Sequence, residues 1–256
     1  MKSPEAAEFA QRTPWRFFAL TFLLAVPFWI LGWQWGALLL PGLPVAALMA
    51  ICPGMAAVIL VRREGNAGGF LLRSVSVFGG IGWPIFAILL ALGIGAATFA
   101  VLHIVQGVSF AIAPPAKLAV LIVMFLIGAW CEELGWSGYA TDPLTAKHGA
   151  FAAAFIIGAV WAVWHYVPLL QAGHDAMWIA WWTLGTLATR FILVRLYTGG
   201  GGSVPAAVLF HATNNLCVFG MNGAYDVRVT ALLLCIAAAL FAVTTAPTDT
   251  PAPRSR

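Results

Sequence analysis

Long apolar runs follow one another along almost the entire chain, and they restrict its fold more than any other feature. Of its 256 residues, 62% are hydrophobic and 9% are charged, whereas about 25% are charged in a soluble domain. In lipid, only helices and closed barrels satisfy the backbone hydrogen bonds. Runs of about 20 apolar residues have the length of a spanning helix and not of a barrel strand. The sequence therefore predicts an all-α, polytopic membrane protein.

The apolar runs divide into eight candidate transmembrane helices within one domain, residues 15–246. The polar segments 1–14 and 247–256 are predicted to be tails, and we find no internal repeat. We expect the spans at 15–33, 43–62, 80–105, 116–138, 149–169, 177–197, 203–221 and 228–246.

Lysine and arginine predict the orientation, because they concentrate in cytoplasmic segments. Placing the N-terminus in the cytoplasm puts 11 of the 13 basic residues on or toward that side and leaves Lys117 and Arg228 outside. Both termini are then cytoplasmic, and we expect the bacterial cytoplasmic (inner) membrane as the location. The net charge of +4 reports this orientation, so no nucleic-acid partner is expected. The partners expected instead are membrane lipid and a hydrophobic or lipidated peptide.

Two adjacent carboxylates, Glu132 and Glu133, follow an uncharged apolar run that begins at Leu118. A charged side chain at the centre of a membrane costs about 2.5–3.5 kcal/mol on insertion scales, and such residues are usually functional or paired. Successive helical residues point about 100° apart. One carboxylate can therefore face an interior cavity while the other contacts a neighbouring helix. A wet position at the inner membrane interface is the alternative.

Two histidines on other apolar runs are candidate partners for this pair. His165 lies in Trp161-Ala-Val-Trp-His165, and His211 lies four residues before Asn215, so His211 and Asn215 share one helix face. A histidine within the membrane is usually a packing residue. Glutamate with two histidines, however, is a known set for activating water or for binding a metal. An asparagine at this place suits a substrate carbonyl or an oxyanion.

The order of these motifs resembles the CPBP family of intramembrane proteases, which includes CAAX prenyl endopeptidases and bacteriocin-processing and self-immunity proteins. The resemblance covers residues 116–220, through Glu-Glu-Leu-Gly-Trp, Trp164-His165 and Leu209-Phe-His211. It implies an all-helical membrane fold and the hydrolysis of a peptide bond within the bilayer.

The resemblance also implies the roles of the site residues. Glu132, Glu133, His165, His211 and Asn215 are the expected catalytic residues. A divalent metal, with zinc as the leading candidate, is expected on Glu132, His165 and His211, although a glutamate-activated water would use the same side chains. The substrate is expected to be cleaved near the cytoplasmic face.

One departure from the family pattern affects Glu133. The first motif of the family normally ends in arginine, and here that position is Ser137. Without a cation beside it, a buried glutamate tends to be protonated. Arg190 lies within an apolar run and is the candidate replacement, which predicts an Arg190–Glu133 pair. Snorkelling of Arg190 to the inner interface is the alternative. The opening aromatic of the second motif, normally phenylalanine, is Trp161.

The depths of the site residues impose a second condition. From the helix rise of 1.5 Å per residue, His165 lies about 24 Å from the inner end of its span and Glu132 about 9 Å from the inner end of its own. They meet only if the helix of Glu132 continues through residues 139–141, or if the helix of His165 begins below the membrane.

Two other classes of protein fit the same residues. A non-catalytic immunity or binding protein of the same fold would explain the missing arginine. A proton-coupled transporter would also use intramembrane glutamate and histidine.

Overall fold

Helices form nearly all of the part of the chain that the computed structural model describes, residues 12–35, 38–40, 43–65, 67–109, 114–220 and 225–244. They are α2 (Pro14–Trp35), the 3-10 helix η1 (Val45–Ile51), α3 (Cys52–Glu64), α4 (Ala67–Val75), α5 (Gly82–Gln106), α6 (Pro115–Trp136), α7 (Thr141–Gln171), α8 (Ala176–Gly199), α9 (Val204–Gly220) and α10 (Val227–Thr244). Two short antiparallel strands, β1 (Leu38–Leu40) and β2 (Leu43–Pro44), pair Leu38 with Pro44 and Leu40 with Leu43. The predicted all-α fold is confirmed.

Every predicted span coincides with an apolar helix, although not every helix has the length of a full span. Among the described residues, six helices are long and apolar enough to cross a membrane, and the shorter apolar helices Val204–Gly220 and Val227–Val243 follow them. The prediction of eight spans therefore holds as an approximate count. Helix α4 was not predicted. The predicted tails lie mostly outside the described residues.

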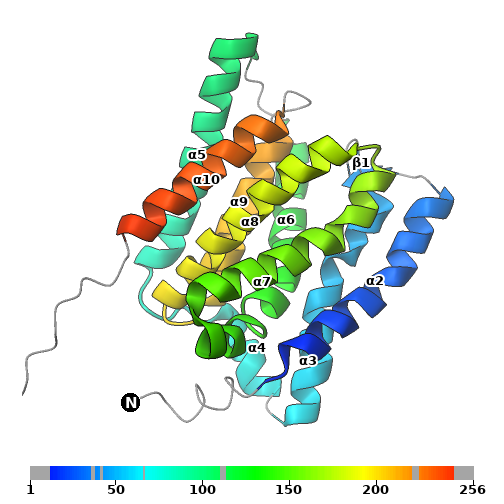
Figure 1. Cartoon of the computed structure of the whole chain (residues 1–256), viewed down its shortest axis with the longest axis vertical. Helices are drawn as coiled ribbons and strands as arrows, with labels where there is room; N and C mark the ends of the chain where they lie inside the picture. The colour runs from blue at the N-terminus through cyan, green and yellow to red at the C-terminus, as the bar shows by residue number, and fades with distance from the viewer. Residues whose placement is uncertain are drawn as a thin grey trace, which may run out of the picture.

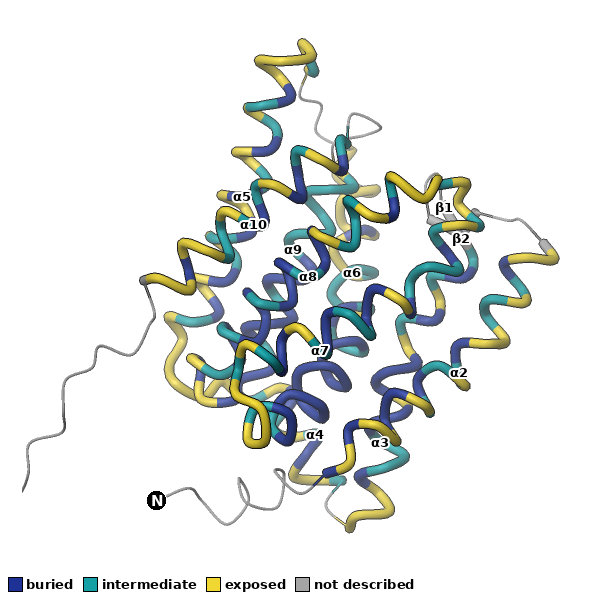
Figure 2. The backbone as a smooth tube through the Cα atoms, viewed as in Figure 1, coloured by how far each residue is buried: buried dark blue, intermediate teal, exposed yellow. Residues whose placement is uncertain are grey.

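The helices pack as a bundle in which α6, α7, α8 and α9 surround the most deeply buried part of the chain (Figures 1 and 2). Helix α8 packs between α7 and α10, and α9 packs against α5 and α6. Glycine permits one close approach: a Cβ atom at Gly135 would lie 2.6 Å from the carbonyl oxygen of Pro53. The large apolar side chains on the outside, such as Leu89 and Val123, suit contact with lipid.

The connection between α6 and α7 is buried. Helix α6 ends at Trp136, but every residue from Glu132 to Thr141 is buried. Helix α7 begins at Thr141, eight residues before its predicted start, and changes direction at Gly149, where φ is 81° and ψ is 162°. The helical segment that carries His165 therefore begins after this bend, close to its predicted start, and a shorter helical segment precedes it. Glu132 and His165 nevertheless line one cavity, so the motifs meet.

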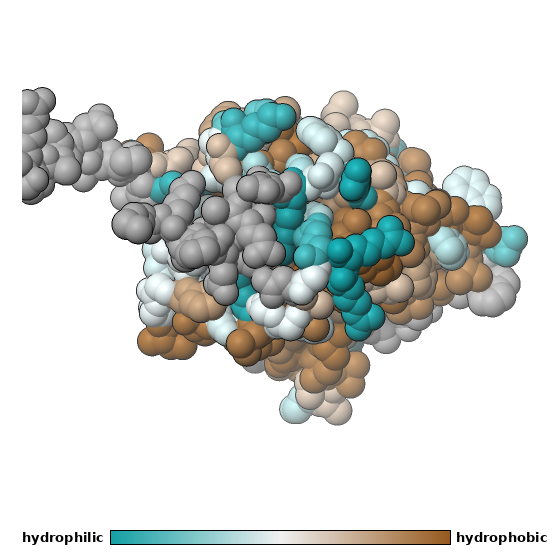
Figure 3. Space-filling model, turned by 90° about the horizontal axis from the view of Figure 1, so that it is seen from below, coloured by the Kyte–Doolittle hydropathy of each residue, from teal (hydrophilic) through white to brown (hydrophobic). Residues whose placement is uncertain are grey.

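The basic residues mark one end of the bundle. Arg62 and Arg63 lie in the last turn of α3, and the exposed Lys147 lies before the bend in α7. Figure 3 views the bundle from this end and shows hydrophilic side chains gathered near the middle, with hydrophobic ones around them. We call this the basic end. The opposite end carries the starts of α6, α8 and α10 and the last residues of α5, α7 and α9.

Candidate active site

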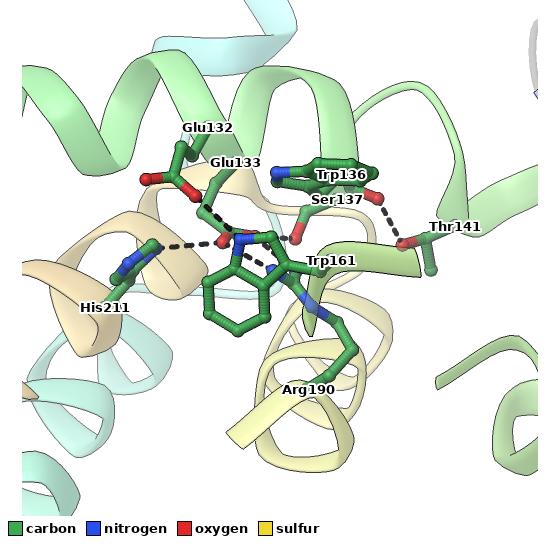
Figure 4. Close-up of polar contacts among 8 residues, drawn as sticks. All are labelled: Glu132, Glu133, Trp136, Ser137, Thr141, Trp161, Arg190 and His211. Atoms are coloured by element: carbon green, nitrogen blue, oxygen red, sulfur yellow. Dashed lines mark hydrogen bonds and ion pairs between the residues drawn. The ribbon is translucent and has the colours of Figure 1, made fainter. Parts of the chain in front are cut away.

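Glu133 is fully buried and accepts hydrogen bonds from three other residues (Figure 4). Arg190 donates to both carboxylate oxygens, with Nη1 2.8 Å from Oε2 and Nη2 3.1 Å from Oε1. Ser137 donates its hydroxyl to Oε2, and His211 Nδ1 lies 3.0 Å from Oε1. Each oxygen of Glu133 therefore has two partners. A carboxylate held in this way is an anchor and not a base that is free to take a proton.

The predicted Arg190–Glu133 pair is confirmed. Both side chains are fully buried in the described structure, so Arg190 does not snorkel to the interface. Arg190 comes from α8, whereas the family arginine would lie at position 137 on the α6 side of the turn. Ser137 still contributes, because its short side chain leaves room for the guanidinium group and donates one bond of its own. The negative charge of Glu133 is thus compensated from a different helix.

Glu132 has the opposite character and faces a cavity. Its Oε2 accepts one hydrogen bond, from Nε1 of Trp161 at 2.7 Å. The carboxylate lines a cavity of about 150 Å³ together with His165, His211 and Asn215. Glu132 is 7% exposed, and Glu133 has no exposed surface. Of the two carboxylates, only Glu132 is placed to act on a molecule in this cavity.

Both histidines are fixed through Nδ1. His165 Nδ1 lies 2.8 Å from the carbonyl oxygen of Trp161, and a carbonyl oxygen only accepts hydrogen bonds. Nδ1 of His165 therefore carries the proton, and Nε2 is the ring nitrogen left with a lone pair. His211 is oriented in the same way by Glu133. In both rings, Nε2 can accept a hydrogen bond from water.

Trp161 contacts four groups of the site: Glu132, Arg190 and both histidines. Besides donating to Glu132, its ring lies 4.2 Å below the guanidinium carbon of Arg190. Its centroid is 5.4 Å from that of His165 and 5.3 Å from that of His211, both edge to face. The sequence identified Trp161 only as an aromatic exchange in the motif. Its indole N–H, which phenylalanine lacks, was the signal that a polar role is possible.

A second, apolar cavity meets the first at the site. It has a volume of about 460 Å³ and shares Glu132, His165 and Asn215 with the smaller cavity. Its other walls come from η1, α6 and α7, with Leu48, Met124 and Phe125 among them. Glu132 therefore lies where a polar cavity and an apolar cavity join.

The expected metal site does not form from the described residues as they stand. No three histidine, cysteine, aspartate or glutamate side chains in that part of the chain are grouped so as to hold a metal ion. Two histidines with protonated Nδ1 and a nearby glutamate are chemically suitable ligands, but their grouping is not that of a ligand set. Zinc on Glu132, His165 and His211 remains a prediction, and the mechanism below does not depend on it.

In a comparison with known proteins, a family model matches the region that carries the motifs. Residues 114–217 match the family model described as type II CAAX prenyl endopeptidase Rce1-like. The chain is 28% identical over 131 residues to CAAX prenyl protease 2 of Methanococcus maripaludis, an alignment that covers 47% of this chain and 48% of that protein. The chain thus matches about half the length of this curated relative. The family match, residues 114–217, covers the helices that supply the candidate site.

Proposed function

Because residues 114–217 belong to the CPBP family of intramembrane proteases, we propose that the chain is an endopeptidase that hydrolyses a peptide bond with a water molecule activated by Glu132. The six long apolar helices and the family make it an integral membrane protein. The observation that carries the mechanism is the difference between the two carboxylates. Glu133 is saturated with hydrogen bonds, whereas one oxygen of Glu132, beside the cavity, has no protein partner among the described residues.

The proposed reaction begins with a water molecule between Glu132 and the histidines. Glu132 removes one proton from the water as its oxygen bonds to the peptide carbonyl carbon, and Nε2 of His165 accepts a hydrogen bond from the other proton. His211, oriented by Glu133, helps to position the same water. A carboxylate held at hydrogen-bond distance from its proton donor acts as a general base in this way.

Asn215 is proposed to stabilise the oxyanion. It lies one helical turn beyond His211 on α9 and lines both cavities. Its amide group donates to the oxygen on which negative charge develops. When the carbon–nitrogen bond breaks, Glu132 passes its proton to the leaving amine, and the carboxylate returns to its starting state.

The apolar cavity supports an apolar or lipidated peptide as the substrate. Its walls present mainly hydrocarbon side chains next to Glu132, and burial of a lipid chain is worth about 0.8 kcal/mol per CH₂ group. The M. maripaludis relative is named as a CAAX prenyl protease, which makes a prenylated peptide the first probe to use.

Hydrolysis of a quenched fluorescent farnesylated CAAX peptide by the purified chain tests the proposal. In H₂¹⁸O, one ¹⁸O atom should enter the new carboxylate, because water is the nucleophile. Glu132→Gln should reduce kcat by at least about 10³-fold, within the usual range for a lost general base. Cleavage by Glu132→Gln at the wild-type rate would refute the assignment of the base.

The structure weakens the main support for a non-catalytic protein. That alternative depended on the absence of the family arginine at position 137, and Arg190 supplies an equivalent cation to Glu133. Four of the five predicted site residues line one cavity, and the fifth, Glu133, contacts His211 behind it. A binding protein would need neither a partly free carboxylate nor fixed histidines beside it.

A further inference from the structure

One face of α8 forms a wall of the polar cavity beside Glu132. Trp182, Thr186 and Thr189 line this cavity, and their spacing of four and then three residues places them on one side of the helix. Trp182 packs on His165, with the two ring centroids 5.1 Å apart. The two threonines continue the same wall, so their side chains share a cavity with the carboxylate of Glu132.

Neither of these threonine hydroxyls has a hydrogen-bond partner among the described residues. A threonine within a helix commonly donates to the carbonyl oxygen four residues earlier, as Thr183 does to Ile179 at 2.7 Å on the same helix. Thr186 and Thr189 make no such bond, although they are only 6% and 5% exposed. Because a buried hydroxyl without a partner is costly, two of them on a cavity wall indicate that the cavity holds a polar molecule.

Further polar groups come from α9. His211, Asn214 and Asn215 line the same cavity, and each asparagine amide can both donate and accept hydrogen bonds. The cavity has a volume of about 150 Å³, and one water molecule takes up about 30 Å³ in the liquid. The polar cavity therefore has both the room and the hydrogen-bonding groups for several water molecules.

The neighbouring apolar cavity is poorly suited to hold water. Apart from the residues that it shares with the polar cavity, its walls are mainly hydrocarbon, with Leu48, Met124 and Ile127 among them. A water molecule bound inside a protein needs about 2–4 polar partners, and cavities lined by hydrocarbon stay dry. Water for a reaction at Glu132 is therefore stored on the threonine side, while the apolar cavity takes the apolar part of a substrate.

We infer that Thr186 and Thr189 hold the water that Glu132 activates. Their hydroxyl groups bind a small group of water molecules in the polar cavity, and the one between Glu132 and Nε2 of His165 is the nucleophile. When a turnover consumes that molecule, a neighbour from the group replaces it. The two threonines are positioning residues, because they act through water and not on the peptide. The inference rests on the proposed function for the use of the water, whereas the presence of water beside the threonines can be measured without it.

Paired substitutions separate the hydroxyl group from the shape of the side chain. Thr→Val replaces the hydroxyl by a methyl group of similar size, and Thr→Ser keeps the hydroxyl but removes the methyl group. Loss of one neutral hydrogen bond corresponds to roughly a two- to tenfold effect. Thr186→Val and Thr189→Val should each lower kcat for the farnesylated peptide within that range, and the double valine variant should lower it by at least about tenfold, with KM unchanged. Both serine variants should keep the wild-type kcat.

Thr183→Val is the matched control on the same helix. Its hydroxyl is already bonded to Ile179, and Thr183 is not among the residues that line either cavity, so kcat should stay at the wild-type value. If the serine variants lose more activity than the valine variants, the threonines act by packing and the inference is overturned. A rise in KM at unchanged kcat would also overturn it, because the hydroxyls would then bind the peptide.

Hydroxyl-radical labelling detects the bound water without any cleavage. X-rays convert water into hydroxyl radicals in place, and the radicals oxidise neighbouring side chains, which mass spectrometry identifies. In the full-length protein, Trp182 should be labelled in the wild type and in Glu132→Gln. Its labelling should fall by at least about fivefold in the double valine variant, because the cavity loses two of its water-binding groups. Labelling of Trp15, which is 55% exposed, should stay constant.

The two measurements distinguish a failure of the inference from a failure of the proposed function. If the wild type cleaves no peptide but labelling of Trp182 depends on the threonine hydroxyls, the proposed function fails and the water site stands. If the peptide is cleaved but labelling of Trp182 is absent or equal in the double valine variant, the inference fails and the function stands. A fall in labelling without a fall in kcat also overturns the inference, because the water that the threonines hold is then not the water consumed.

Discussion

Removal of Arg190 should expose how strongly the site depends on one buried ion pair. In Arg190→Met, Glu133 loses two hydrogen bonds, of 2.8 and 3.1 Å, and the arginine that pairs with it. Both side chains have no exposed surface, so water does not replace the lost partner. Breaking a buried pair by removing one member costs about 3–5 kcal/mol. For a protein of this size, that corresponds to a fall of roughly 6–20 °C in the unfolding midpoint.

A double-mutant cycle separates the pair from its surroundings. Replacing both members, as in Glu133→Leu with Arg190→Met, removes the uncompensated charge, and substitution of a whole buried pair by apolar residues is often neutral. The double variant should therefore unfold closer to the wild type than Arg190→Met does. The assay is thermal unfolding in detergent at one heating rate, read together with peptide hydrolysis.

Moving the cation back to its family position is the most demanding form of this test. Ser137→Arg with Arg190→Met places an arginine one helical turn after Glu133 and should recover most of the stability and hydrolysis that Arg190→Met loses. Ser137→Arg alone should destabilise the chain, because position 137 is fully buried and its carboxylate partner is already saturated. The reasoning is refuted if Arg190→Met leaves stability and hydrolysis unchanged while Glu133→Gln abolishes hydrolysis.

Four further outcomes are expected from the site. Trp161→Phe keeps an aromatic ring but removes the hydrogen-bond donor to Glu132. Because a hydrogen bond to a charged group is worth about 1.5–3 kcal/mol, kcat should fall by roughly ten- to a hundredfold. The acidic limb of the pH–rate profile should also move to higher pH. Glu132→Gln should lose hydrolysis but keep the wild-type unfolding midpoint within a few degrees, whereas Glu133→Gln should lower both; equal unfolding midpoints would contradict the anchor role. Gly128→Leu, in the wall of the apolar cavity, should raise KM about tenfold for a farnesylated peptide and leave an unlipidated peptide unaffected. Dialysis against a chelator, with metal analysis of the purified protein, decides the zinc prediction: hydrolysis that survives complete metal removal excludes it, and loss that one equivalent of zinc restores establishes it.

The apolar runs predicted the helices well, because lipid-facing helices must be apolar over their whole length. The segment 141–148 was missed for a related reason. It holds Asp142, Pro143 and Lys147 and therefore looks like a loop, yet Thr141 and Leu144 are buried and fix it as the first part of α7. Its helical character depends on contacts with other elements, which hydropathy along the chain does not report.

The candidate site could be predicted in its members but not in their roles. Glutamate, histidine and arginine are energetically costly within apolar runs, so their presence there indicates a functional or paired residue. On this basis the Arg190–Glu133 pair was predicted correctly. Nothing along the chain shows that Glu133 is saturated and that Glu132 faces the cavity, since both are glutamates on one helix. That distinction comes from the rotation of α6 relative to α8 and α9. The role of Trp161 was missed because its hydrogen bond spans 29 positions of sequence.

The position of the cation changes what Glu133 holds together. With an arginine at position 137, four residues after Glu133, the ion pair would lie within one turn of the same segment and would need no other helix. Here Glu133 of α6 is bonded to Arg190 of α8 and to His211 of α9, so one carboxylate links three helices. Those three helices also carry walls of the polar cavity. The geometry of the water-activating groups is thus tied to the packing of α6 on α8 and α9. A change in that packing would displace His211 first and Glu132 only afterwards.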